Sequence, residues 1–311
     1  MSRRLLIILL STALFAAGAC GDEASMVRLI EEKATVRVEI GGKHFTTYYF
    51  ADGMGRPYVR PFFYPVLAAD GTPLTSDQAT AGGDHPHHRS LWVAHGDVNG
   101  ADHWSLNAKP PPRQRHIRFV SLAGDTIVQE LQWEDKTSEP ILRETRTMRF
   151  IVYPDGARAI DFKLVFEPLD KPVTFGDTKE AGLCSVRMAK EISKNPAITN
   201  SAGATGEKAC WGKPAKWCDQ SGVIDGKPFG IAILDHPSNP RHPATWHVRA
   251  YGLMTANIFG LHDFDPKKPK GAGNLTIEKG KPVTFRYRVV VHAGDAAAAK
   301  IDEKWQHFAA E

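Results

Sequence analysis

The sequence predicts an all-β protein, a large antiparallel β-sandwich with a short C-terminal helix. Short segments in which apolar and polar residues alternate run through most of the chain, and such alternation is typical of strands with one buried face. Turn-forming sequences separate these segments at intervals of about ten residues, as they do in sandwiches and barrels. We find no internal repeat and no linker, so we expect residues 20–311 to form a single β-sandwich domain.

The clearest strand pair lies near the start of this domain. In residues 35–40 apolar side chains alternate with polar ones, which predicts one buried and one exposed face. Gly41 and Gly42 then predict a tight turn into a second strand over 44–50. The stretch 56–67 is rich in aromatic residues and proline, which favours an edge strand or an ordered loop.

Further strands are predicted where apolar runs are bounded by turn residues. They cover 117–122, 126–134, 142–152, 159–167, 173–175, 183–188, 230–235 and 283–291. After the last of these, we expect Asp295 to N-cap a helix that starts at Ala296 and continues toward Trp305 and Phe308.

The N-terminus has the parts of an export signal. Arg3 and Arg4 precede an apolar run over 5–10, and small residues over 16–19 precede Cys20. Residues 17–20 are similar to a bacterial lipoprotein box, which implies that residues 1–19 are removed and that Cys20 is lipidated. Ordinary cleavage with an unmodified Cys20 is the alternative. We expect an exported protein of the periplasm or outer membrane that contacts the membrane through its lipid anchor alone, since no later apolar stretch is long enough to cross a bilayer.

Charge and cysteine content narrow the partners and the covalent structure. The formal net charge is +4 and the pI is about 8.8. Lys and Arg are scattered without a nucleic-acid motif, so we expect no nucleic-acid partner. The spacing of Cys210 and Cys218 suits a disulfide across a hairpin in an oxidising compartment. Cys184 would then remain as a buried, small apolar residue.

The densest group of chemically active side chains lies in the segment 82–92, Gly-Gly-Asp-His-Pro-His-His-Arg-Ser-Leu-Trp. If this segment is extended, His85 and His87 share one face and His88 points to the other. A third histidine from a later segment would then complete a site for copper, zinc or iron. Histidines in such a cluster equally suit proton transfer.

Polar side chains gather in two further segments, 177–180 and 236–262, and we expect all three segments to meet in one cleft. Aromatic rings beside a dense polar network suit a sugar. Glu180 is predicted as the catalytic base, with His88 or His247 as proton donor. The predicted substrate-binding residues are Arg89, Trp92, Arg187, His236, Asn239, His242, Trp246, Tyr251 and Asn257, with Arg89 or Arg187 holding an anionic group and Trp104 as a further aromatic wall.

Several of these segments also carry a family resemblance. They are residues 60–66, 83–92, 176–180, 217–222, 235–243, 246–252 and 257–260. Together they resemble a bacterial family of exported proteins that is often labelled "methane oxygenase PmoA". The resemblance implies a large antiparallel sandwich with His, Arg and Glu side chains in a cleft, similar to carbohydrate epimerases, lyases and hydrolases of the galactose-mutarotase-like type.

We therefore expect an exported carbohydrate-active enzyme of the epimerase, lyase or hydrolase type that acts on a small-molecule or oligosaccharide substrate. The family label suggests an alternative, an oxygenase whose metal is bound by His85, His87 and a later histidine. A second alternative, from a different class, is a non-catalytic glycan-binding lipoprotein.

Overall fold

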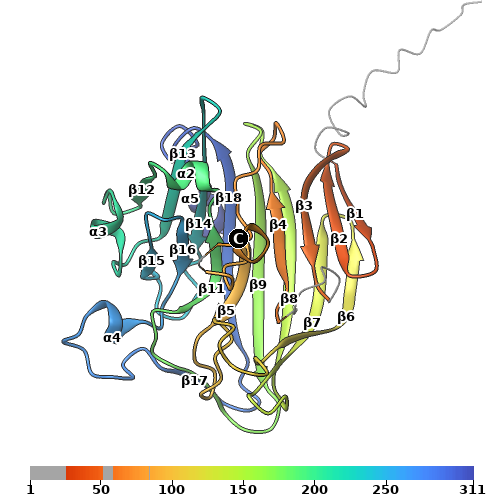
Figure 1. Ribbon diagram of the computed structural model, residues 1–311, viewed down its shortest axis with the longest axis vertical. Coiled ribbons are helices and arrows are strands. Elements are labelled where there is room, and N and C mark those ends of the chain that lie inside the picture. The colour runs from red at the N-terminus through yellow and green to blue at the C-terminus, as the bar shows by residue number, and fades with distance from the viewer. Residues whose placement is uncertain (1–25, 52–58, 84) are drawn as a thin grey trace, which may run out of the picture.

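The computed structural model describes residues 26–51, 59–83 and 85–311. Within these ranges the chain forms two eight-stranded sheets and one pair of short strands. The strand pairings are antiparallel, and the two large sheets lie against each other (Figure 1). The predicted antiparallel β-sandwich is thus confirmed. The predicted signal, residues 1–19, and Cys20 lie outside the described residues.

The first sheet contains, in spatial order, β1 (Val27–Glu31), β2 (Thr35–Ile40), β3 (Lys43–Tyr49), β4 (Phe62–Val66), β5 (Leu91–His95), β11 (Ala181–Arg187), β16 (Leu253–Ala256) and β15 (Trp246–Val248). The second contains β12 (Ala197–Asn200), β13 (Trp217–Ile224), β14 (Lys227–Asp235), β18 (Val283–Ala293), β9 (Arg158–Pro168), β8 (Pro140–Val152), β7 (Thr126–Glu134) and β6 (Gln114–Ala123). The short strands β10 (Val173–Phe175) and β17 (Leu275–Ile277) pair with each other.

The residues that the structure describes form few helices, and these are short. They are α1 (Gln78–Ala81), α2 (Lys190–Ser193), α3 (Glu207–Cys210), α4 (Leu261–Phe264) and α5 (Ile301–Ala309). Across the described part of the chain, none has the length and apolar character needed to cross a bilayer.

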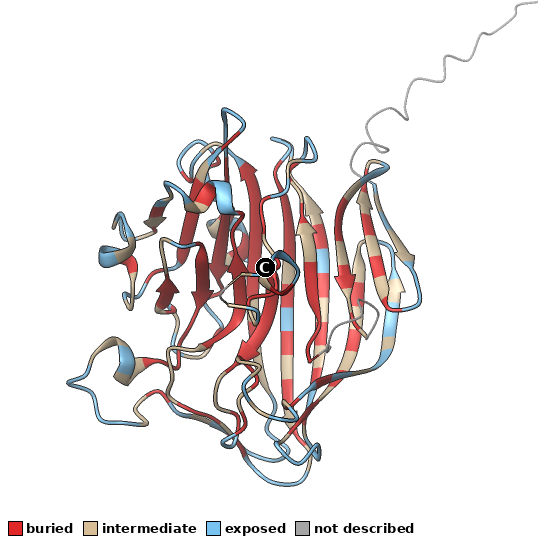
Figure 2. Cartoon of the chain, viewed as in Figure 1, coloured by how far each residue is buried: buried red, intermediate tan, exposed pale blue. Residues whose placement is uncertain are grey.

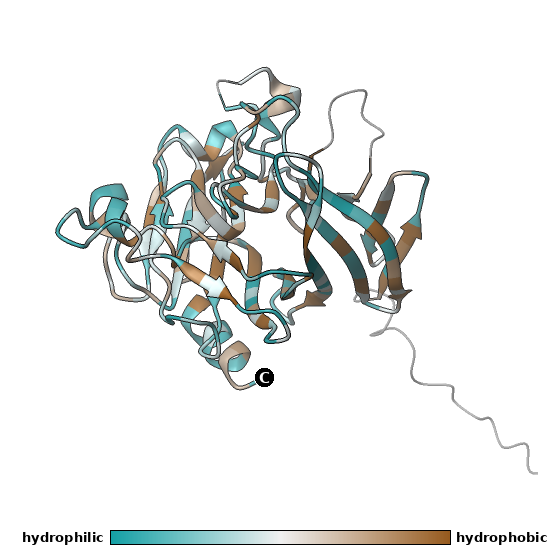
Figure 3. Cartoon of the chain, turned by 90° about the horizontal axis from the view of Figure 1, so that it is seen from below, coloured by the Kyte–Doolittle hydropathy of each residue, from teal (hydrophilic) through white to brown (hydrophobic). Residues whose placement is uncertain are grey.

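One large cluster of buried apolar side chains fills the space between the sheets. Successive residues of a strand point to opposite faces, so Leu91 and Val93 of β5 join this cluster whereas Trp92 and Ala94 do not. Figure 3 shows the same alternation of apolar and polar residues along other strands. The central strands are buried along nearly their whole length, whereas β6, β7 and β8 alternate between buried and accessible residues (Figure 2).

The hairpin predicted from residues 35–50 is confirmed. Alternate residues of β2 are fully buried, and Gly41 and Gly42 have φ values of 57° and 71°. Two successive positive φ angles match the tight hairpin turn that glycine favours.

The outer face of the second sheet is covered by α5. Ile301 and Phe308 of the helix pack with Leu234 of β14 and Val290 of β18, which explains why these strands are buried on both faces. The predicted helix was present but its start was wrong. Asp295 accepts a hydrogen bond from the Ala298 amide at 2.8 Å, and this closes a turn; the helix itself begins after Lys300, whose φ is 52°.

The stretch 56–67 was predicted to be an edge strand or an ordered loop, and the edge position is wrong for the strand that it contains. Residues 52–58 lie outside the described ranges, and the strand that follows, β4, lies inside the first sheet between β3 and β5. Pro65 cannot donate to a ladder, and the β3–β4 register is correspondingly irregular between Thr46 and Tyr48. Pairing with β5 is restricted to Phe62 and Phe63.

The three cysteines that the structure describes, Cys184, Cys210 and Cys218, are buried free thiols. Cys210 ends α3 and Cys218 lies in β13, so the predicted disulfide across a hairpin is not formed in this structure. The two thiols are nevertheless neighbours, because a hydrogen bond from Cys218 lowers the pKa of Cys210. Cys184 is buried as predicted, and burial raises the pKa of its thiol.

The inter-sheet core predicts that replacing two isoleucines, one buried and one exposed, has very different effects on stability. Ile233 of β14 is 0% exposed, whereas Ile117 of β6 is 40% exposed. We expect Ile233→Ala to lower the free energy of unfolding by about 2–5 kcal/mol, through lost burial and the cavity left behind. Ile117→Ala should change it by less than about 1 kcal/mol. Urea denaturation of both variants measures the difference, and equal losses would contradict this assignment of the core.

Candidate functional site

A pocket of about 480 Å³ lies on the outer face of the first sheet. It is lined by His85, His87, His88, Gly96, Asp102, Trp104, Ser105, Asn107, Thr178, Glu180 and Tyr251. Two of the three polar segments predicted from the sequence therefore meet here, the histidine-rich stretch and the segment around Glu180. From the third segment, 236–262, Tyr251 is the residue that lines the pocket.

The histidine-rich stretch forms a turn rather than a strand. The His88 amide donates to the carbonyl of His85 at 2.9 Å, and the His88 carbonyl accepts from the Gln78 amide at 3.0 Å. The expectation that His88 points away from His85 and His87 is therefore wrong. The ring centroids of the three histidines lie 4.5–5.7 Å apart on one wall of the pocket.

His88 is held in one tautomer. Arg187 Nη1 lies 3.0 Å from His88 Nδ1, and because a guanidinium only donates, Nδ1 accepts and Nε2 carries the proton. Trp92 stacks on the imidazole with centroids 5.5 Å apart. Burial, followed by the nearby charges of His87 and Arg187, holds the pKa of His88 far below its usual value. His88 is therefore an uncharged hydrogen-bond donor at neutral pH.

His87 is also uncharged at neutral pH. Burial and the Arg60 guanidinium lower its pKa to about 4. Arg60, which sequence reasoning did not select, is 2% exposed and donates to the carbonyls of His87 at 2.5 Å and His103 at 2.7 Å. It joins the histidine-rich turn to the loop that carries Asp102 and Trp104. Burial lowers the pKa of Arg60 itself to about 9.

Glu180 lies on a segment that is fixed through its backbone. The Lys179 carbonyl accepts from His247 Nδ1 at 2.7 Å and from Asn257 Nδ2 at 3.0 Å. Gly96 packs so closely that a Cβ there would lie 2.6 Å from the Glu180 carbonyl oxygen. The Glu180 side chain is 42% exposed and lies 3.2 Å from Lys179 Nζ, an exposed ion pair that contributes little to stability.

His247 and Asn257 thus support the segment that carries Glu180, and neither lines the pocket. In the strand register His247 lies opposite Thr255, and Thr255 lies opposite Ser185. Ser185 in turn lies opposite Trp92. Opposite residues share a face, so His247 lies on the same face as Trp92 but three strand spacings away, roughly 14 Å. Burial lowers the pKa of His247.

The two arginines predicted to hold an anionic group lie behind the pocket wall. Arg89 is paired with Asp77, with Nε to Oδ1 at 2.7 Å, and its guanidinium stacks on Phe62 at 3.9 Å. Arg187 bonds His88 and also faces the Tyr251 ring at 4.7 Å. Neither guanidinium is part of the pocket lining.

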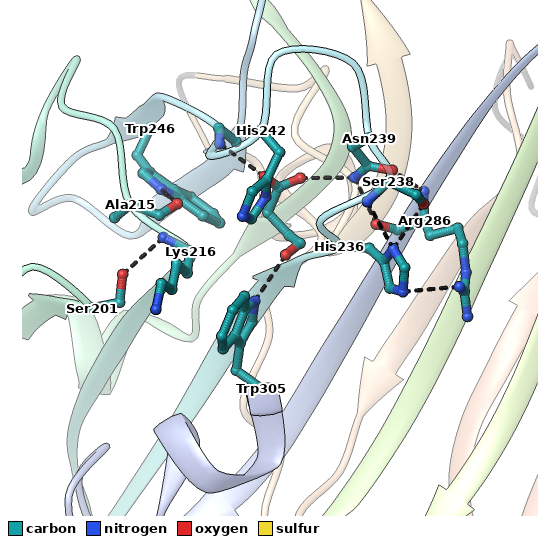
Figure 4. Close-up of polar contacts among 12 residues, drawn as sticks. Ser201, Ala215, Lys216, His236, Ser238, Asn239, His242, Trp246, Arg286 and Trp305 are labelled. Atoms are coloured by element: carbon teal, nitrogen blue, oxygen red, sulfur yellow. Dashed lines mark hydrogen bonds and ion pairs between the residues drawn. The ribbon is translucent and has the colours of Figure 1, made fainter. Parts of the chain in front are cut away.

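The remaining predicted residues belong to a separate polar cluster around Asp235, at the end of β14 (Figure 4). The Asp235 carboxylate accepts from His242 Nδ1 and from Asn239 Nδ2, both at 2.7 Å. His236 bonds Ser238 and Arg286. Trp246 donates to the Ala215 carbonyl, and Trp305 donates to the Asp235 carbonyl, as Figure 4 also shows. These groups satisfy one another, so the cluster joins β14, β18 and α5, and none of its predicted residues lines the pocket beside His88.

Several residues of the pocket escaped sequence reasoning. Asp102 Oδ1 accepts from the amides of Trp104 and Ser105 at 2.8 and 2.9 Å, and Oδ2 contacts the Ser105 hydroxyl. Asn107 and Thr178 add an amide and a hydroxyl to the lining. An Asp followed two and three residues later by the amides it accepts is a local turn signal, and that signal marks a loop without marking a site.

The arrangement does not fit the predicted copper, zinc or iron site at His85 and His87. Among the described residues, no three His, Cys, Asp or Glu side chains are grouped so that they could hold an ion. The rings of His85 and His88 are stacked at 4.8 Å and 13°, and Nδ1 of His88 already accepts from Arg187.

The lowered pKa of His87 predicts a pH dependence of stability. An unfolded histidine has a pKa of about 6.5, so between about pH 6.5 and pH 4 the unfolded chain binds a proton that folded His87 does not. The free energy of unfolding should therefore fall as the pH falls through this window. His87→Gln should make the free energy of unfolding depend less steeply on pH, by the contribution of up to one bound proton. Denaturation at several pH values measures this dependence. An NMR titration of His87 near pH 6.5 would contradict the assignment.

The comparisons with known proteins concern the chain as a whole. No curated protein matches the sequence. Among solved structures, the chain is similar to a GalM/aldose epimerase homologue from C. elegans, with 7% identity, a TM-score of 0.37, and coverage of 86% of this chain and 98% of that one. It is also similar to HI1317, with 8% identity, a TM-score of 0.30, and coverage of 86% and 99%.

A family model provides the sequence-level assignment. It matches residues 35–306, which include both sheets almost entirely and every residue that lines the pocket. Its description is a family of unknown function, so the methane oxygenase label stays a prediction. The chain belongs to this family of unknown function, DUF6807.

Proposed function

We propose that the protein is an exported carbohydrate-active enzyme that moves protons on a sugar in the pocket beside His88 and Glu180. One observation carries the proposal: Arg187 fixes the uncharged His88 with its proton on Nε2, and a carboxylate, Glu180, lines the same pocket. A carboxylate that accepts a proton and a neutral hydrogen-bond donor that stabilises the resulting oxyanion are the two groups that proton abstraction next to a carbonyl needs.

The pocket lining suits a polyhydroxylated ligand. Apart from Gly96, every described residue of the lining carries a hydrogen-bonding side chain. Tyr251, which is 37% exposed, adds ring surface on which the C–H face of a sugar can pack. The volume of about 480 Å³ lies within the range of small-molecule pockets, roughly 300–1,000 Å³.

The protonation states favour one kind of reaction. His88 is neutral, so it stabilises a developing oxyanion by donating a hydrogen bond and does not hand over a proton as an imidazolium would. Glu180 accepts the proton from a carbon next to a carbonyl. If the enolate turns within the pocket, protonated Glu180 returns the proton to the opposite face of the same carbon, which gives epimerisation. If protonated Glu180 instead gives the proton to a departing β-oxygen, the result is elimination. Glycoside hydrolysis needs a protonated acid at the leaving oxygen, which neutral His88 does not supply.

Two alternatives remain, and the exchange experiment below separates the first of them from the proposal. A glycan-binding lipoprotein would bind sugars in this pocket without turnover. An oxygenase would need a metal, and the described residues offer no group of three ligands for one, so no observation favours it over proton transfer.

Proton transfer predicts exchange with solvent. Incubated in D2O with a panel of reducing aldoses, ketoses and uronates, the wild type should incorporate deuterium at a carbon next to the carbonyl of its substrate. Glu180→Gln should slow this at least about a hundredfold, because it removes the base, and His88→Gln should slow it while leaving sugar binding measurable. Mass spectrometry and NMR of the recovered sugar give both rates.

The matched control for this experiment is Glu167→Gln. Glu167 lies on β9 with its side chain 43% exposed, close to the 42% of Glu180, so its loss changes net charge equally. Its exchange rate should equal that of the wild type. Sugar binding without exchange in the wild type would favour the glycan-binding module, and absence of binding to any sugar would refute the proposal.

Export is the second part of the proposal, and it rests on the sequence of residues 1–20. Expressed in a bacterium with an outer membrane, the protein should incorporate a palmitate analogue and fractionate with membranes. Cys20→Ser should abolish the label, because the thiol is the acceptor of the lipid. Cys184→Ser, at a buried thiol, should keep it. Labelling that persists in Cys20→Ser would rule out this anchor.

A further inference from the structure

The fixed charges of the pocket lining are all negative. Asp102 and Glu180 supply carboxylates, and no lysine or arginine occurs among the lining residues in the part of the chain that the structure describes. The lining therefore presents negative charge and no fixed cation to whatever enters.

The charged and titratable groups around the lining do not cancel the negative charge of Asp102 and Glu180 inside the pocket. His87 and His88 have lowered pKa values and add no positive charge at neutral pH. Arg60 is buried with its guanidinium on two backbone carbonyls. Arg187 lies behind His88 and the ring of Tyr251.

Lys179 is the nearest cation to the Glu180 carboxylate. Its ammonium lies 3.2 Å from that carboxylate, and 45% of the side chain is exposed, so solvent screens it.

The two carboxylates differ in what they can offer a ligand. Asp102 accepts from two backbone amides and from the Ser105 hydroxyl, which leaves it occupied within its own loop. The Glu180 carboxylate pairs with the exposed ammonium of Lys179, and 42% of the Glu180 side chain is exposed to solvent. Its oxygens are therefore available to accept hydrogen bonds from ligand hydroxyls.

We infer that the pocket takes sugars without a negative charge and discriminates against uronates and sugar phosphates, with Glu180 as the residue that sets this specificity. The inference rests on the proposed function and names its substrate class. A carboxylate on the ligand would face the Glu180 carboxylate with no cation in the lining between them, and like charges at an interface are strongly disfavoured. The prediction that an arginine holds an anionic substrate group is thereby replaced.

The test compares matched sugars that differ only in charge. D-Galactose and D-galacturonate form one pair, and D-glucose and D-glucuronate form the other; saturation-transfer NMR and calorimetry measure their binding to the mature protein at neutral pH. In at least one pair we expect the neutral sugar to bind at least about tenfold more tightly than the uronate. Glu180→Gln should narrow this ratio by improving uronate binding, whereas Glu167→Gln should leave it unchanged.

The outcomes of this test separate three claims: the charge selection, the role of Glu180 and the proposed function. A uronate that binds as tightly as its neutral partner, or more tightly, overturns the charge selection and leaves carbohydrate proton transfer standing. If the neutral sugar binds as much more tightly than the uronate in Glu180→Gln as in the wild type, the role of Glu180 in this specificity is overturned. If neither sugar of either pair nor any sugar of the exchange panel binds, the proposed function fails and this inference fails with it. Thermal denaturation of both Gln variants confirms that each is folded.

Discussion

The structure depends on how the outer faces of its central strands are covered. In both sheets these strands are buried on two sides, as the uninterrupted burial of β5 and β11 shows. On the second sheet the cover is apolar, because α5 places Ile301 and Phe308 over β14 and β18. On the first sheet the cover consists of loops, and a loop brings backbone and polar side chains into contact with a sheet surface. Those polar groups must then find partners without water.

This requirement explains the chemistry of the pocket. Trp92 and Trp104 supply apolar surface above β5, while Arg60 satisfies two carbonyls of the covering loops. A buried imidazole is cheaper to keep neutral than charged, so the burial that covers the sheet also sets His87 and His88 to their uncharged forms. Protonation states that suit catalysis thus follow from the packing of the fold, before any ligand is present.

Most of the fold could be predicted because strand alternation is a local property. The limits of β7 and β10 agree with the predicted ranges, and turns with glycine fixed the hairpin at Gly41. The start of α5 could not be predicted in this way. Asp295 does cap a turn, but whether a turn continues as a helix depends on where its apolar residues pack, and that contact is with strands distant in the sequence. The place of β4 inside its sheet depends equally on partners far along the chain.

The candidate site was predictable only in part, and the reason lies in hydrogen bonding rather than composition. The segments 82–92 and 235–243 are both rich in histidine, proline and arginine. Around Asp235 the polar groups bond one another and the adjacent backbone, and the result is a structural junction. In the other segment His85, His87 and His88 line an open volume. Composition cannot separate these outcomes, since the difference is whether the fold bonds the polar groups into a junction or places them beside an open volume. His247 and Asn257 neither line the pocket nor belong to the junction around Asp235. Both donate to one backbone carbonyl, that of Lys179. Although they were predicted for their side-chain chemistry, they contribute to the site by holding the backbone that carries Glu180.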